Sequence, residues 1–87
     1  RAVQSIVDGA AEVFEAEALS TSPLVGIPIK EARLPQGVVI AAVVRGKQVL
    51  TPRGETVVQA GDRVIVAARA VMVKRVEKLF AVRLDYF

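Results

Sequence analysis

The chain has 87 residues, 53% of them hydrophobic, with 12 basic and 9 acidic side chains and a formal net charge of +3. This composition predicts one small packed domain and excludes a disordered chain. The sequence has no histidine and no cysteine. Their lack excludes the usual zinc sites, Ser-His-Asp and Cys-His triads, and disulfides. So high an apolar fraction in so short a chain indicates that a partner covers part of the surface.

The chain begins with Arg1 rather than Met, so we expect it to be part of a longer protein. No apolar stretch approaches the roughly 20 residues of a membrane span, and the first residues lack the apolar core of a signal peptide. The basic residues are spread along the chain, and only 5% of the residues are aromatic. A nucleic-acid interface concentrates cations and adds aromatic side chains, so nucleic-acid binding is not expected.

Residues 10–19 have two interpretations. Their Ala, Glu and Leu content favours a helix, whereas the alternation of Phe14 and Ala16 with Glu15 and Glu17 favours a half-exposed strand. Propensity alone favours the helix.

Residues 24–34 predict a short helix. Pro28 suits its first turn, where a missing N–H costs little, and Pro35 stops it because the residue before a proline avoids the helical region.

A continuous apolar, β-branched run over residues 38–45 predicts a strand covered on both faces. Gly46-Lys47 then predicts a two-residue hairpin turn, with residues 48–50 as the returning strand. Residues 56–59 predict a short strand, and residues 63–68 predict another buried strand.

Residues 70–80 have helical period, with an apolar stripe formed by Met72, Val73, Val76, Leu79 and Phe80. The predicted fold class is α+β: a small, mostly antiparallel sheet with a short helix after the first strand and a C-terminal amphipathic helix. We expect a single domain over residues 1–87. It comprises a leading linker or strand over 1–9, a core over 10–80 and a tail over 81–87 that alternates like an added strand.

Motifs for phosphate binding do not match. Gly46-Lys47 lacks the spacing of a Walker A loop, and no dinucleotide-binding GxGxxG is present. Gly61-Asp62 could supply an anion nest or a metal carboxylate, but a turn between strands is the favoured interpretation. Arg45 ends an apolar strand, and its guanidinium group could point at an anion. On the residues alone a solvated edge charge is favoured.

The order of these features resembles the TrkA-C family, also called the RCK C-terminal domain. The residues that carry the resemblance are Ser22, Gly26, Leu34, Arg45, Pro52, Gly54, Gly61 and Asp62. It covers about residues 10–80, and both ends of the chain resemble the last domain of the potassium-uptake regulators in this family. The resemblance implies that residues 11–19 form a strand and that the domain pairs with a second copy of itself.

The resemblance implies a regulatory domain of a Trk-type potassium-uptake system that is not an enzyme and holds no metal. NAD or ATP would bind only in a Rossmann domain that is absent here. Some family members bind cyclic di-AMP between two subunits. Carried over, Val39 and Ile40 form an apolar wall and Arg45 meets a phosphate, with Pro52 nearby.

The implied partners are a second copy in a homodimer, the Rossmann domain of the same chain and a TrkH-type membrane subunit, with no nucleic acid. The implied location is cytoplasmic, peripheral to the inner face of the cell membrane. The alternative is a TrkA-C binding module of another membrane transporter, either an anion permease or a cation/proton antiporter.

Overall fold

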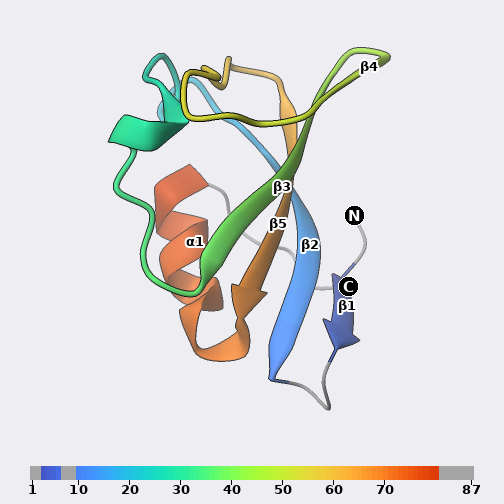
Figure 1. Ribbon diagram of the computed structural model, residues 1–87. Coiled ribbons are helices and arrows are strands. Elements are labelled where there is room, and N and C mark those ends of the chain that lie inside the picture. Colours follow the sequence, from blue (N-terminus) through green and yellow to red (C-terminus); the bar gives the residue numbers. More distant parts are fainter. Residues whose placement is uncertain (1–2, 7–9, 81–87) are drawn as a thin grey trace.

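The computed structural model describes residues 3–6 and 10–80, where one antiparallel sheet is covered on one face by a helix (Figure 1). The sheet has five strands in the spatial order β1-β2-β5-β3-β4, and every neighbouring pair is antiparallel. In chain order they are β1 (Val3–Ile6), β2 (Ala11–Glu17), β3 (Val38–Arg45), β4 (Gln48–Leu50) and β5 (Arg63–Arg69). The predicted α+β class with its antiparallel sheet is confirmed.

Strand β2 occupies the segment whose amino-acid propensities favour a helix, so that expectation is wrong and the strand implied by the family resemblance is confirmed. Strand β5 pairs with it along its whole length, and β1 pairs with its first four residues. Phe14 and Ala16 are buried, whereas Glu17 is exposed. Pairing on both edges and this alternation outweigh a helix preference of a few tenths of a kcal/mol per residue.

The short helix expected over residues 24–34 is reduced to one 3-10 turn, η1 (Ile29–Glu31). The backbone N–H groups of this segment are used elsewhere: that of Gly26 donates to Val58, and that of Ile29 donates to Thr56. The segment therefore lies against residues 54–58. These residues form isolated bridges rather than the separate strand expected over 56–59.

Strand β3 and its hairpin agree with the predictions. Arg45 pairs with Gln48 across a two-residue turn, and Gly46 takes the left-handed conformation with φ 62°. A bulge between Ile40 and Ala42 interrupts the register with β5. Because a bulge adds one residue to one strand, it reverses which face each later side chain points to.

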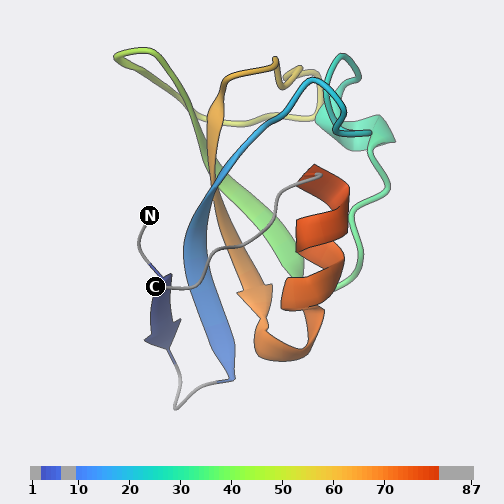
Figure 2. The ribbon, with the colours of Figure 1, turned by 180° about the vertical axis from the view of Figure 1, so that it is seen from behind.

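The C-terminal helix α1 (Val73–Phe80) follows a 3-10 turn, η2 (Ala70–Met72), and lies along one face of the sheet (Figure 2). Val73 and Val76 of α1 are buried in the same core as Phe14 of β2 and Val66 of β5. We call the face of the sheet that packs on the helix the inner face. No helix in the described part of the chain has the length and apolarity to cross a membrane.

The loop before η1 is joined to the end of the helix by Ser22. Its buried hydroxyl donates to the carbonyl of Leu79 at 2.6 Å and accepts the N–H of Leu24 at 3.1 Å. One of the last helix carbonyls, which lack partners within the helix, is thus satisfied. This contact accounts for the serine in the family pattern.

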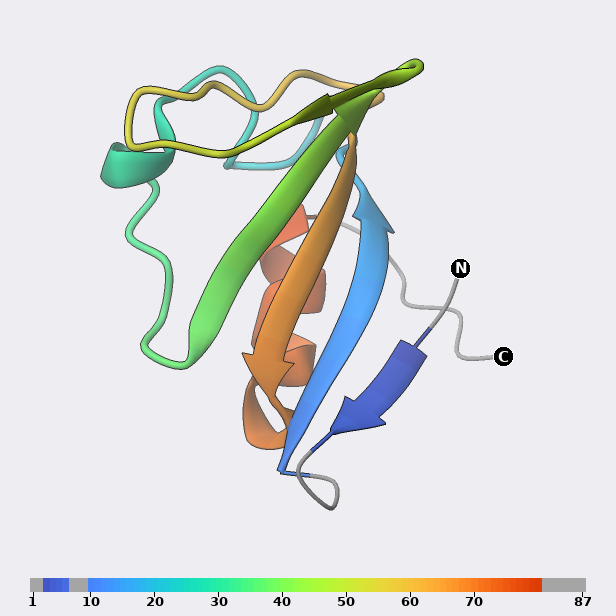
Figure 3. The ribbon, with the colours of Figure 1, turned by 45° about the vertical axis from the view of Figure 1, so that its right-hand side comes forward.

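The opposite, outer face of the sheet is open: α1 lies behind the sheet in Figure 3, and no described element crosses its front. Strands β3 and β5 were expected to be covered on both faces, and within the described residues only the inner face is covered. The extra strand expected in the tail falls on residues 81–87, outside the described residues.

Candidate functional site

Arg45, at the end of β3, is placed on the inner face by the bulge. Before the bulge Ile40 pairs with the buried Val66, and after it Val43 pairs with the buried Val64. Two residues further along the same face, Arg45 comes opposite Asp62. Without the extra residue, Arg45 would point to the outer face, away from the carboxylate.

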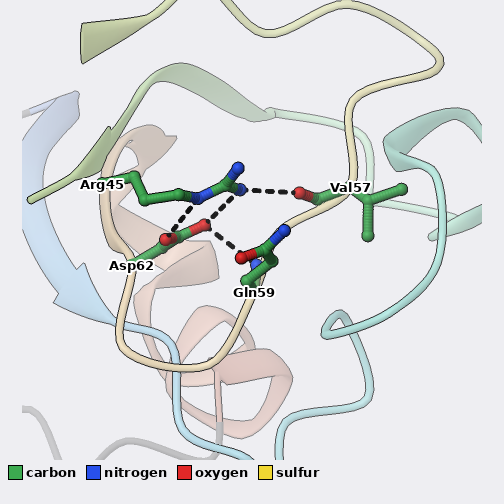
Figure 4. Close-up of polar contacts among 4 residues, drawn as sticks. All are labelled: Arg45, Val57, Gln59 and Asp62. Atoms are coloured by element: carbon green, nitrogen blue, oxygen red, sulfur yellow. Dashed lines mark hydrogen bonds and ion pairs between the residues drawn. The ribbon is translucent and has the colours of Figure 1, made fainter. Parts of the chain in front are cut away.

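Arg45 and Asp62 form a two-bond ion pair (Figure 4). Nε of Arg45 donates to Oδ1 of Asp62 at 3.0 Å, and Nη2 donates to Oδ2 at 2.8 Å. The same Nη2 donates to the carbonyl of Val57 at 3.0 Å, while Oδ2 also accepts the N–H of Gln59 at 2.9 Å. The pair therefore joins the end of β3, the segment 57–59 and the residue that precedes β5.

The two side chains differ in exposure, which is 2% for Asp62 and 34% for Arg45. Hydrogen bonding from Arg45 lowers the pKa of the Asp62 carboxyl below its ordinary value of 3.8, outweighing the opposing effect of burial. The same hydrogen bond raises the pKa of Arg45. Both groups are therefore charged at neutral pH.

The turn before Asp62 depends on a glycine. Gly61 has φ +91°, a conformation that side chains with a Cβ rarely adopt. Its N–H donates to the backbone carbonyl of Ala18 at 2.8 Å, and the N–H of Ala18 donates to the backbone carbonyl of Asp62 at 2.8 Å. The Gly61-Asp62 pair is thus a turn between strands, as favoured from the sequence, and its carboxylate is an ion-pair partner.

The structure separates the four residues expected to bind a ligand. Val39 is 59% exposed on the outer face, whereas Ile40 is 8% exposed and lies in the core. Arg45 lies six residues beyond Val39 on the same strand, about 20 Å away at the usual rise. Pro52 is half-buried in the loop after β4. One chain does not bring these side chains together, so the site stays a prediction about two chains.

Within the described residues, Arg45 keeps one guanidinium nitrogen, Nη1, for a ligand. Its hydrogen bonds use Nε and Nη2, and no described residue accepts a hydrogen bond from Nη1, which points away from the carboxylate in Figure 4. An anion could therefore meet Arg45 at Nη1 without displacing Asp62. Among the described residues, no three His, Cys, Asp or Glu side chains gather to hold a metal ion.

Sequence reasoning singled out Arg45 but missed that Asp62 is its partner. A signal was present, because Asp62 directly precedes β5 and continues the alternation of its buried residues Val64, Val66 and Ala68. The register that sets Arg45 opposite Asp62 depends on the bulge, and the sequence gives no sign of it.

Comparison with known proteins identifies the family. The profile of the family described as "TrkA-C domain" matches residues 13–81. The "Trk system potassium uptake protein TrkA" of Azorhizobium caulinodans is 54% identical over the whole chain, and that of Halomonas elongata is 43% identical over 98% of it. The chain spans only 19% and 20% of the lengths of these relatives.

A solved structure supports the fold independently. A chain described as "Structure of RCK domain with cda" superposes with a TM-score of 0.65, and the match covers 78% of this chain and 96% of that one. Its sequence identity of 20% makes it a likeness of fold alone. The family profile covers most of the sequence, and the fold agrees with it. The chain therefore belongs to the TrkA-C domain family.

Proposed function

We propose that this chain is a regulatory, non-catalytic domain of a Trk-type potassium-uptake system. The observation that carries the proposal is that the whole of this chain matches the C-terminal region of a relative named as a Trk potassium-uptake protein. The proposal includes a Rossmann domain in the same chain, a TrkH-type membrane subunit as partner, and a cytoplasmic position at the inner face of the membrane. The relatives named above favour this assignment over another transporter.

The non-catalytic part of the proposal is supported by chemistry. The sequence has no histidine and no cysteine, so common nucleophile–base pairs cannot be built from this chain alone. The strongest polar cluster in the described residues, Arg45 with Asp62, is occupied in holding the fold together. A regulatory domain acts instead by favouring one arrangement of the larger protein over another.

The domain functions as a homodimer in this proposal, and the outer face of the sheet is the surface that a second copy covers. Val39 and Val49 are 59% and 69% exposed there. Their cross-strand partners Ala67 and Val44, together with Ile65, extend the same apolar surface. The open face of an antiparallel sheet is normally polar. This one is apolar, and a second copy would supply the missing cover.

We expect the wild-type chain to run as a dimer in size-exclusion chromatography with light scattering. Val39→Lys places a charge in the centre of the proposed interface and is expected to shift the chain to monomer. Val71→Lys is the matched control, since Val71 is 77% exposed but lies before the helix, and it should remain dimeric. A monomeric wild type at high concentration, or equal effects of both variants, would contradict this surface.

A cyclic di-AMP site between two copies completes the proposal. In support, Nη1 of Arg45 has no acceptor among the described residues, and Val39 lies on the face that a second copy would cover. The similar solved structure is described as containing "cda". Arg45 would meet a phosphate through Nη1, while Asp62 keeps the guanidinium in place.

We expect calorimetry to show binding of cyclic di-AMP to the wild-type dimer and loss of most of that binding in Arg45→Ala. Removing one charged hydrogen bond typically costs about 1.5–3 kcal/mol, a loss of roughly 10- to 150-fold. Arg75→Ala, on the exposed face of α1, is the control. In cells, potassium uptake through the full-length protein should respond to cyclic di-AMP with wild type and not with Arg45→Ala. No heat with wild type would exclude the ligand.

A further inference from the structure

One face of helix α1 and the turn before it carries a group that we call the basic stripe: Val71, Lys74, Arg75 and Lys78. All four side chains are exposed, and Val71 is 77% exposed. Lys74 and Lys78 are one helical turn apart, so they lie on the same side of α1. Val73 and Val76 are buried against the sheet, so the stripe points away from the core.

The basic stripe accounts for the net charge of the whole chain. Its three cations equal the net charge of +3, because the other nine basic and nine acidic residues of the chain cancel. Among the described residues, the acidic side chains beside the stripe are Glu77 on the helix and Glu12, which lines a surface hollow together with Lys74 and Val71. The stripe therefore remains positive, with one apolar side chain at its start.

We propose that the basic stripe docks on the anionic lipid headgroups of the membrane surface. Lys and Arg near such a surface each contribute about fivefold to binding, and an exposed apolar side chain can enter the headgroup region. This inference rests on the membrane-peripheral position proposed above. The positive charge of the stripe favours lipid over the loops of a membrane subunit. Cytoplasmic loops of membrane proteins carry an excess of Lys and Arg and would repel the stripe.

The stripe and the proposed dimer surface lie on opposite sides of the sheet (Figure 3). A dimer formed through the outer face would leave both stripes accessible and facing in opposite directions. Only one stripe could then reach a given flat membrane. Lipid binding per domain should therefore be nearly the same in the dimer and in the monomeric Val39→Lys variant, which allows the two proposals to fail separately.

The test uses sedimentation of the 87-residue chain with vesicles of equal parts phosphatidylserine and phosphatidylcholine. We expect co-sedimentation at ~0.1 M salt, little at ~1 M salt, where the Debye length falls from about 10 Å to about 3 Å, and none with phosphatidylcholine alone. The triple variant Lys74→Gln, Arg75→Gln, Lys78→Gln should lose binding by roughly 100-fold. The control Lys30→Gln, Lys47→Gln, Arg53→Gln removes three exposed charges elsewhere and should retain it.

A second readout locates the contact. The sequence has no tryptophan, so Val71→Trp introduces a single fluorescent reporter within the stripe. Its emission should shift to shorter wavelength when anionic vesicles are added, whereas Val49→Trp on the opposite side should not respond to vesicles. A chain that ignores anionic vesicles, equal losses in the two triple variants, or an unresponsive Val71→Trp would each overturn the inference. A wild-type dimer that does not bind anionic vesicles would overturn the membrane-docking inference and leave the proposed function unaffected.

Discussion

Replacing Phe14 with alanine should lower the free energy of unfolding by about 3–5 kcal/mol, the usual range for removing a buried phenylalanine. Phe14 is 2% exposed and is the largest fully buried side chain in the described core. It lies on the inner face of β2, opposite Val66 of β5. Its loss leaves a cavity between the centre of the sheet and the helix. A small sheet with one covering helix has few neighbouring side chains that could move in to fill this cavity.

That loss is large beside the total stability expected of a domain this size, about 4–13 kcal/mol at 0.05–0.15 kcal/mol per residue. The variant should therefore unfold at a much lower urea concentration, followed by circular dichroism. Leu19→Ala is the control, because Leu19 is 38% exposed and its truncation should cost less than about 1 kcal/mol. Similar midpoints for the two variants would show that Phe14 does not centre the core.

The strands of the sheet were predictable where the sequence pattern has one interpretation. The β-branched runs of β3 and β5, and the glycine turn at Gly46, satisfy local and tertiary preferences together. Residues 10–19 and 24–34 were harder, because their local preference for helix is weak and distant partners decide the outcome. Strand β2 is fixed by β1 and β5, and the segment around η1 by its bonds to residues 54–58.

The candidate site was predictable only in part for a related reason. Arg45 was recognisable as a cation ending an apolar strand, and Asp62 as a carboxylate in the turn before another. Whether they meet depends on which face Arg45 occupies. One extra residue at the bulge between Ile40 and Ala42 decides that, since it reverses the face of every later side chain in β3.

Asp62→Asn should lower the free energy of unfolding at neutral pH by about 2–3 kcal/mol, below the usual cost of breaking a buried ion pair because Arg45 keeps contact with water. Asparagine keeps the shape of the side chain but loses its charge. Its amide nitrogen must also face either Nη2 or Nε of Arg45, where two donors oppose each other. The hydrogen bonds that join residue 62 to Arg45 and Gln59 are therefore weakened together.

The wild-type domain should also lose stability in acid, and the variant should lose less. The folded state lowers the pKa of Asp62 below 3.8, chiefly through the hydrogen bonds from Arg45, so the unfolded chain binds the proton more tightly. The stabilisation from this carboxylate is complete above the unfolded pKa and is lost as the pH falls through the lower, folded pKa. Asp62→Asn has no carboxylate here, so its unfolding free energy should depend less on pH in that range.

Urea unfolding at a series of acidic and neutral pH values measures both effects. Glu15→Gln is the matched control, because Glu15 forms an ion pair with Arg63 at 3.7 Å between partly exposed side chains, and such pairs contribute about 0–1 kcal/mol. The difference between wild type and Asp62→Asn should narrow as the pH falls, while Glu15→Gln stays close to wild type throughout. A difference that is small at neutral pH and constant in acid would show that the carboxylate does not hold Arg45 in solution. The anion site proposed at Nη1 would then lose its fixed geometry.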